Sequence, residues 1–286
     1  MRPTPTVVVA PGSFEVTVIF RQLIDPETST HTYLLADRNS REAVLIDTVH
    51  EQFDRDRTLL RELDLTLRYT LETHLHADHV TASGRFRKEL ESKVVLGAAC
   101  GVANADIALR DGDRICFGAH VLVAWPTPGH TCGCITYVCR EEGMAFTGDA
   151  LLIRGCGRTD FQEGNAATLF ESVRKKIFSL PDETLLYPGH DYRGRTVTTV
   201  GEEKRFNPRL GLGKSEADFV SLMNQLDLAY PKKIDIAVPA NRESGLAFST
   251  DLGSIVQERP DAASSVASVM ETQGRQDAEV WMGMGI

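Results

Sequence analysis

The chain has 286 residues, of which 42% are hydrophobic and 25% charged, as in ordinary globular proteins that bury a full core. Its net charge of −9 argues against a nucleic-acid partner, because nucleic-acid-binding surfaces usually need a basic face. The apolar run at residues 7–10 is too short for a secretory signal or a membrane span, so we expect a cytoplasmic protein without a membrane partner. None of the six cysteines forms a Cys-x-x-Cys pair, so reduced thiols are expected.

Short β-type runs and helical segments alternate along the chain. Runs rich in β-branched and aromatic residues predict strands at 16–20, 32–36, 43–47, 67–71, 94–96, 114–117, 121–125, 134–139, 144–146 and 184–187. The spacing of apolar residues predicts helices over 51–63 and 83–90, and a third that starts at the N-cap Asn165 and stops before Pro181. The region 197–241 reads as mostly helical, including 217–226, and we expect it to cover the site.

Two strand-rich halves that each carry helices predict an α/β protein, an αββα sandwich of two sheets with helices outside. Because polar candidates follow the strands, they should converge along one edge, where loops can vary without disturbing the core. Residues 1–248 show no linker and are expected to form one catalytic domain. Residues 249–286 are expected to be a C-terminal extension, helical near 262–270 and packed on the same domain.

Three histidines and an aspartate fall within six positions directly after the strand predicted at 67–71: His74, His76, Asp78 and His79. His74 and His76 are two residues apart, so both side chains can point to the same side of an extended segment. Three further candidates each follow a glycine: His130, Asp149 and His190. Imidazole and carboxylate groups bind zinc and iron, so the pattern predicts a metal site. The isolated histidines, in contrast, are expected to be structural: His31, His50 and His120.

Two other patterns are weaker indications of function. The Gly-Leu-Gly-Lys-Ser run at 211–215 resembles the end of a P-loop, but Pro208 stands where that motif needs a glycine. We therefore expect a loop before a helix, with Ser215 near its N-terminus. Cys132 and Cys134 lie close to His130 and could bind metal, but small residues in a turn that enters a strand are the preferred interpretation.

Longer stretches carry a family resemblance. The His-x-His-x-Asp-His cluster, with Asp149 and His190, resembles the metallo-β-lactamase superfamily. Two branches compete: the dinuclear thioester hydrolases of glyoxalase II type, and the iron persulfide dioxygenases of the ethylmalonic-encephalopathy protein family. Residues 73–84, 145–162, 187–192, 207–210 and 238–241 are similar to motifs of the second branch. The Gly-Cys pair at 133–134 also stands where glyoxalase II typically has Gly-His.

The resemblance to the second branch implies one ferrous ion per chain, held by the catalytic residues His74, His130 and Asp149. Such a 2-His-1-carboxylate set leaves positions open for substrate and oxygen. The remaining polar residues near the ion would orient ligands or waters without binding the metal: Asp47, His76, Asp78, His79 and His190. Matching family positions imply substrate-binding roles for Tyr192, Arg209, Asn241 and Arg158.

The implied reaction is oxidation of glutathione persulfide, or a similar low-molecular-weight persulfide, by O₂ to sulfite and free thiol. The ligand types alone do not enforce this choice, because the complete dinuclear set equally predicts a two-zinc hydrolase of acyl-glutathione thioesters. A metal-dependent sensor without turnover is a third alternative. A homodimer is compatible with the resemblance but is not indicated by any sequence pattern.

Overall fold

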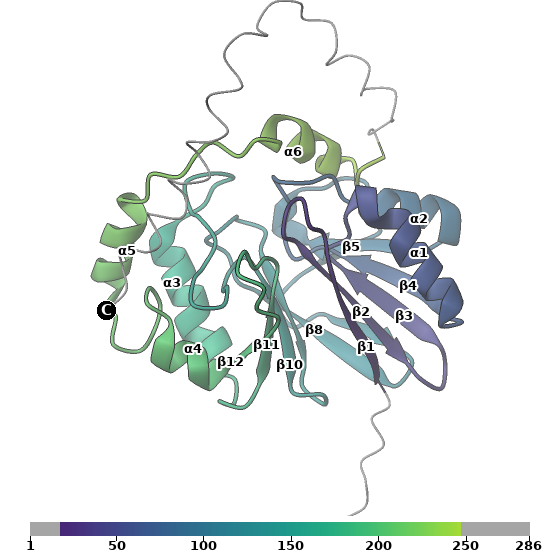
Figure 1. Cartoon of the computed structure of the whole chain (residues 1–286), viewed down its shortest axis with the longest axis horizontal. Coiled ribbons are helices and arrows are strands. Elements are labelled where there is room, and N and C mark those ends of the chain that lie inside the picture. Colours follow the sequence, from purple (N-terminus) through teal and green to yellow (C-terminus); the bar gives the residue numbers. More distant parts are fainter. Residues whose placement is uncertain (1–17, 247–286) are drawn as a thin grey trace, which may run out of the picture. The chain divides into compact units, whose positions relative to one another are not determined.

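The computed structural model describes residues 18–246, which form two six-stranded sheets with helices on their outer sides (Figure 1). The first sheet has the order β1 (Val18–Ile24), β2 (His31–Asp37), β3 (Glu42–Ile46), β4 (Thr66–Leu71), β5 (Lys93–Gly97) and β6 (Ile107–Leu109). The second has the order β12 (Thr198–Thr199), β11 (Leu185–Pro188), β10 (Met144–Gly148), β9 (Ile135–Cys139), β8 (His120–Pro126) and β7 (Arg114–Phe117). The predicted αββα sandwich is confirmed.

Three of the helices connect strands that pair in parallel. The pairs β3–β4, β4–β5 and β10–β11 are parallel, so each of them needs a crossover connection. The crossovers are α1 (Phe53–Glu62), α2 (Ser83–Leu90) and α3 (Ala166–Lys175). The three later helices are α4 (Val200–Phe206), α5 (Glu216–Asn224) and α6 (Ile234–Arg242). Figure 1 shows α1 and α2 outside the first sheet, α3 to α5 outside the second, and α6 near the edge where the sheets meet.

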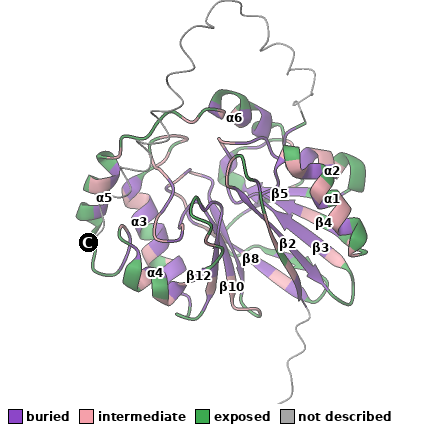
Figure 2. Ribbon diagram, in the orientation of Figure 1, coloured by how far each residue is buried: buried purple, intermediate pink, exposed green. Residues whose placement is uncertain are grey.

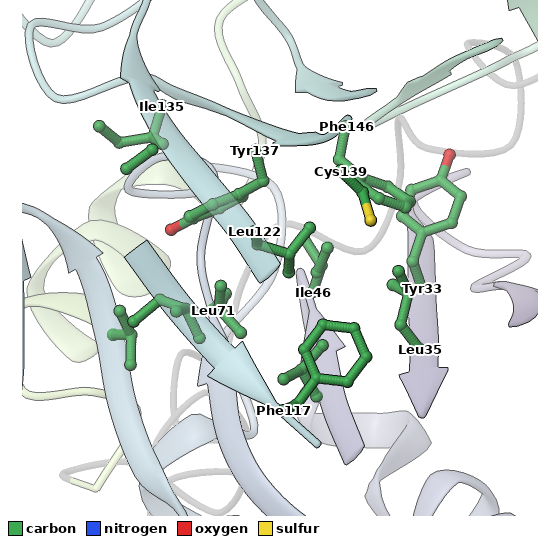
Figure 3. Close-up of a cluster of buried hydrophobic side chains, with 14 of the residues drawn as sticks. Tyr33, Leu35, Ile46, Leu71, Phe117, Leu122, Ile135, Tyr137, Cys139 and Phe146 are labelled. Carbon is green, nitrogen blue, oxygen red and sulfur yellow. The ribbon is translucent and has the colours of Figure 1, made fainter. Parts of the chain in front are cut away.

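The main core lies between the two sheets, and the strands are correspondingly buried (Figure 2). Tyr33 and Leu71 come from the first sheet, and Phe117, Tyr137 and Phe146 from the second (Figure 3). These side chains are almost inaccessible to solvent, and burying each one stabilises the fold by about 1.5–3 kcal/mol. The same strands therefore hold their ends, and the loops that follow them, in fixed positions.

Most of the predicted elements are confirmed, and most of their ends shift by one or two residues. The exceptions are β1, which continues to Ile24, and α3, which ends at Lys175 and is followed by the 3-10 turn Ile177–Ser179 before Pro181. Asn165 is the N-cap of α3, and its side-chain oxygen accepts a hydrogen bond from Thr168 N at 2.9 Å. Ser215 is the N-cap of α5 and forms a capping box with Asp218. Strands β6 and β12 were not predicted, because three and two residues are too short to show alternation.

The described residues, 18–246, belong to one compact unit, and the second unit, Phe248–Ile286, lies outside them. The predicted C-terminal extension at 249–286, its helix near 262–270, and the first two residues of the strand predicted at 16–20 therefore all fall outside the described part. Between residues 18 and 246, no helix is both long and apolar enough to cross a membrane.

Asp37 ties the two sheets together at the end opposite the histidine cluster. One of its carboxylate oxygens accepts hydrogen bonds from Asn39 N and Ser40 N, at 2.8 and 2.7 Å, and the other accepts one from Ala119 N at 3.0 Å. The hydrogen bond from Ala119 and those from the turn outweigh burial and lower the pKa of this carboxyl to about 2. The charged form is thus the one that the folded state stabilises.

Replacing Asp37 with asparagine should destabilise the protein by about 2 kcal/mol at pH 7. Because the folded pKa lies below the ordinary value of 3.8, this stabilisation is present above pH 3.8 and is lost as the pH falls towards 2. Urea unfolding at a series of pH values should show the difference between the two proteins shrinking below pH 4. Asp54→Asn, at an exposed position on α1, should change stability by less than about 0.5 kcal/mol.

Candidate metal centre

Three candidate ligands meet at one edge of the sandwich. His74 follows β4 of the first sheet, whereas His130 follows β8 and Asp149 follows β10 of the second sheet. One potential ligand atom from each lies within 4.8 Å of the other two, and His130 Nε2 is 3.8 Å from Asp149 Oδ2. The trio is therefore assembled from both halves of the fold.

Hydrogen bonds orient both imidazoles for metal binding. His74 Nδ1 lies 3.0 Å from Thr73 Oγ1, whose hydroxyl donates to Asp47 Oδ2 at 2.8 Å, so Nδ1 is the donor towards Thr73. His130 Nδ1 donates to the carbonyl oxygen of Arg158 at 2.7 Å. In each ring the proton is thus on Nδ1, and the lone pair of Nε2 is available to an ion.

The charge states of the trio also suit a divalent cation. Burial lowers the pKa of His74 well below 6.5, and the neighbouring rings of His76 and His130 lower it further, so His74 is neutral. Burial alone would raise the pKa of Asp149, but the charge and hydrogen bond of His190 outweigh it, so Asp149 is a carboxylate. A metal ion requires deprotonated ligands, and these residues supply them.

The loop after β10 passes close to two of the ligands. A Cβ atom added at Gly157 would lie 2.7 Å from His130 Nδ1 and 2.7 Å from the carbonyl oxygen of Asp149. At Gly155, two residues earlier, the nearest atom to an added Cβ would be 3.8 Å away, in Leu152. Only the absence of a side chain at Gly157 lets this loop carry the Arg158 carbonyl to His130.

A second cluster of polar side chains lies beside His74, His130 and Asp149. His190 Nδ1 is 2.7 Å from Asp149 Oδ1, and His190 Nε2 is 3.1 Å from Asp78 Oδ2. Asp78 also contacts His79 Nδ1 at 3.0 Å, and the Thr30 hydroxyl donates to it at 3.1 Å. Burial alone would lower the pKa of His190, but Asp149 and Asp78 raise it well above 6.5. His190 therefore bridges two carboxylates as a cation.

His76 is held by two buried carboxylates. Its Nε2 lies 3.1 Å from Asp47 Oδ1 and 3.3 Å from Glu72 Oε2. Burial alone would lower the pKa of His76, but Asp47 and Glu72 together raise it to about 10. The sequence reasoning missed Glu72, although it stands two residues before His74; its other oxygen accepts hydrogen bonds from Ser83 and Thr81.

The second group could itself hold an ion. One potential ligand atom from each of His76, Asp78 and His79 lies within 4.8 Å of the other two. Among the described residues, His76 Nδ1 and His79 Nε2 are buried without a hydrogen-bond partner. The residues of a dinuclear centre are thus all assembled, so the geometry alone does not fix the number of ions.

The four predicted substrate-binding residues are placed differently. The exposed ring of Tyr192 stacks on His190, with centroids 6.0 Å apart, at the outer side of the centre. Arg209 is half-buried, with Nη1 3.9 Å from Cys156 Sγ. Arg158 forms a bidentate ion pair with Asp160. These three stay predictions as substrate contacts.

Asn241, the fourth, is buried on α6, and its amide is occupied by the histidine loop. Its Nδ2 donates to the carbonyl oxygens of His76 and His79, both at 2.9 Å, and its Oδ1 accepts from Thr81 N at 2.8 Å. Both amide protons are therefore used within the protein. Asn241 supports the loop rather than facing solvent.

Replacing Thr73 with valine should weaken metal binding by about 10- to 100-fold, because His74 loses the hydroxyl that orients its ring. Anaerobic competition with a chromophoric chelator measures the affinity. Thr70→Val is the matched control, since this buried hydroxyl on β4, three residues before Thr73, has no hydrogen-bond partner among the described residues. Equal affinities for the two variants would contradict the orienting role.

Comparisons with known proteins agree with this architecture. Residues 25–190 match the family model described as the metallo-beta-lactamase superfamily. The human protein named persulfide dioxygenase ETHE1, mitochondrial, is 51% identical over 239 residues, which cover 84% of this chain and 93% of that protein. The crystal structure of ETHE1 from Myxococcus xanthus is 53% identical, with a TM-score of 0.77, and the match covers 79% of this chain and 99% of that one.

Hydroxyacylglutathione hydrolases, the glyoxalase II type, match less of the chain. A hydroxyacylglutathione hydrolase from Bartonella quintana is 40% identical over 136 residues, which cover 46% of this chain and 52% of that protein. The match to the persulfide dioxygenases, in contrast, extends over nearly the whole length of those proteins. The chain therefore belongs to the persulfide dioxygenase family of the metallo-β-lactamase superfamily.

Proposed function

We propose that this chain is an iron-dependent persulfide dioxygenase that oxidises glutathione persulfide, or a similar small persulfide, with O₂ to sulfite and free thiol. The observation that carries the proposal is the 51% identity to the human persulfide dioxygenase over 84% of this chain. The partial match to the hydroxyacylglutathione hydrolase spans less than half of the chain.

The residues present fit a single ferrous ion. His74 and His130 each direct an Nε2 lone pair into the centre, and Asp149 supplies one carboxylate oxygen. Two imidazoles and one carboxylate form the ligand set typical of non-haem Fe(II) oxygenases. When bound, iron would supply the open positions at which O₂ and the persulfide sulfur react.

The chain's own groups orient this centre and receive the substrate. The ring of His190 holds one oxygen of Asp149, which leaves the other facing His130. Tyr192 lies on the solvent side of His190, where an incoming peptide thiol would pass. Since glutathione is anionic, the cationic side chains of Arg158 and Arg209 are proposed to attract it, and Asn241 to keep the histidine loop in place.

A dinuclear thioester hydrolase is the second candidate. The observation in its favour is the group formed by His76, Asp78 and His79, two of which carry buried nitrogens without a hydrogen-bond partner among the described residues. A second ion there would resemble the arrangement in glyoxalase II-type enzymes. This candidate requires two ions per chain and no consumption of oxygen.

One experiment separates the two candidates. Protein purified without oxygen should contain about one iron per chain by mass spectrometry of metals, and should take up O₂ when glutathione persulfide is added. Sulfite and free glutathione should appear in equal amounts. Two zinc ions per chain, with thiol release from an acyl-glutathione and no oxygen uptake, would instead establish the hydrolase.

A cytoplasmic location and a homodimer stay predictions. The human relative is named as a mitochondrial protein. Cell fractionation would test the location, and light scattering on the purified chain would test the number of subunits.

A further inference from the structure

The backbone around His74 is held from both sides by the second half of the fold. The carbonyl oxygen of Thr73, the residue before it, accepts a hydrogen bond from Ile135 N at 2.7 Å. The carbonyl oxygen of Leu75, the residue after it, accepts one from Gln162 Nε2, also at 2.7 Å. The first bond comes from the backbone of β9, whereas the second comes from a side chain in the loop between β10 and α3.

The backbone of Gln162 also contacts the loop that carries His130. Cys132 N donates a long hydrogen bond to the carbonyl oxygen of Gln162, at 3.4 Å. A Cβ atom added at Gly164 would lie 2.8 Å from the carbonyl oxygen of His130, so the two loops are in close contact here. Gln162 therefore touches the loops of both imidazole ligands, one through its amide and the other through its backbone.

Gln162 and Glu163 adopt an unfavourable backbone conformation at this place. They are the central residues of a turn that is closed by a hydrogen bond from Gly164 N to the carbonyl oxygen of Phe161, at 2.8 Å. Their φ angles are 49° and 60°, in the left-handed region that glycine and asparagine adopt more readily than other residues. Strain of this kind persists where surrounding contacts enforce it, and it is concentrated at functional sites.

The bond to Leu75 joins segments that lie 87 positions apart in the chain. Leu75 is buried and stands between His74 and His76, so a shift of its carbonyl group would move the segment that carries the first ligand. A metal site requires its ligands to be held within about 0.5 Å of the binding geometry. A link of this length and position can therefore decide whether both imidazoles reach the same ion.

The contacts described for the metal centre act on each ring separately. Thr73 orients the ring of His74, and the carbonyl oxygen of Arg158 orients that of His130. Neither contact sets the distance between the two loops. A link that spans both loops is needed for that, and Gln162 has the contacts to supply it.

We propose that Gln162 is a positioning residue that fixes the separation between His74 and His130. The inference rests on the proposed metal centre, in which both imidazoles bind the same ion. The amide of Gln162 holds the His74 loop, and its carbonyl oxygen holds the His130 loop, so both Nε2 lone pairs stay within reach of one ion. Without the amide, the His74 loop can move relative to the His130 loop.

The first test compares Gln162→Met with Gln22→Met in the full-length chain, loaded with Fe(II) without oxygen. Gln22 is the matched control, because it is also half-buried and its Nε2 donates to a distant carbonyl oxygen, that of Thr196, at 2.8 Å. Each variant loses one such bond, so both should melt about 2–4 °C below the parent. Competition with a chromophoric chelator should show about 10-fold weaker binding in Gln162→Met and a change of less than about 2-fold in Gln22→Met.

The geometry of the centre gives a second readout. The visible absorption bands of bound Co(II) depend on the number and arrangement of its ligands. In cobalt-loaded protein, Gln162→Met should shift these bands or change their intensity, whereas Gln22→Met should have the parental spectrum. A residue that only stabilises the fold would leave the spectrum of the folded protein unchanged.

Gln162→Asn separates the positioning role from stability. Asparagine tolerates a positive φ, so the melting temperature should not fall by more than about 2 °C. Its amide is one methylene group shorter and cannot reach Leu75, so the metal affinity should still fall by about 10-fold.

Two outcomes would overturn the proposal. Equal changes of affinity in Gln162→Met and Gln22→Met would show that only general stability was lost. Parental affinity and a parental cobalt spectrum in Gln162→Met, with a raised KM for glutathione persulfide, would make Gln162 a substrate contact instead. The chelator and cobalt measurements do not require oxygen uptake, so they decide the role of Gln162 even if the parent chain is found not to be a dioxygenase.

Discussion

Replacing Asp149 with asparagine is expected to remove the metal from the chain and to lower oxygen uptake with glutathione persulfide more than about 100-fold. The amide cannot supply the negative charge that faces His130 Nε2 at 3.8 Å. It also leaves the cation of His190, which lies 2.7 Å from the carboxylate, with less compensation. Metal content per chain, measured after anaerobic purification, is the primary observation, and circular dichroism shows whether the variant is folded.

Asp78→Asn is the matched control, because Asp78 contacts the same histidine from its other side. A single-ion centre held by His74, His130 and Asp149 predicts that this variant keeps about one metal per chain, with affinity within about 10-fold of the parent. A dinuclear centre predicts a different outcome, in which Asp78→Asn loses one of two ions. Loss of half the metal in this variant would contradict the single-ion centre.

Replacing Gly157 with alanine should also lower the metal affinity and the activity, each by about 100-fold. The added Cβ would lie 2.7 Å from His130 Nδ1 and 2.7 Å from the carbonyl oxygen of Asp149, closer than such atoms can approach. The backbone at Gly157 does not have a positive φ, so the effect comes from the collision and not from backbone strain. The loop must then move, which separates the Arg158 carbonyl from His130.

Gly155→Ala tests the same loop without the collision, since the nearest atom to its added Cβ is 3.8 Å away. This variant should keep its metal and most of its activity. Metal titration and the thermal melting curve of both variants distinguish local displacement of His130 from general unfolding. If Gly157→Ala binds metal as tightly as Gly155→Ala, the contact with His130 does not position the ligand.

The fold could largely be predicted because the strong signals were local. Runs such as 32–36 and 114–117 have the composition of buried strands, and Asn165 has the chemistry of an N-cap, so their structure is set within a few residues. The His-x-His-x-Asp-His spacing similarly indicated a metal centre without any tertiary knowledge. The short strands β6 and β12 depend instead on pairing with neighbours that lie far along the chain.

The parts of the site that could not be predicted are contacts that no sequence motif indicates. Glu72 stands only four residues before His76 but has no distinctive motif, so its contact with that ring depends on the path of the loop. Asn241 was expected to contact substrate, yet its amide supports a loop more than 160 residues earlier in the chain.

The division of the ligands between the two sheets has a consequence for how the protein acquires its cofactor. His74 emerges from the ribosome early, but it has no partner ligand until the second sheet has been made and has docked on the first. The ligand trio of His74, His130 and Asp149 therefore does not exist in a nascent chain that has only its first sheet. Metal loading at this trio is thus expected late in maturation, after the two sheets have docked, and a bound ion would then link residues of both sheets.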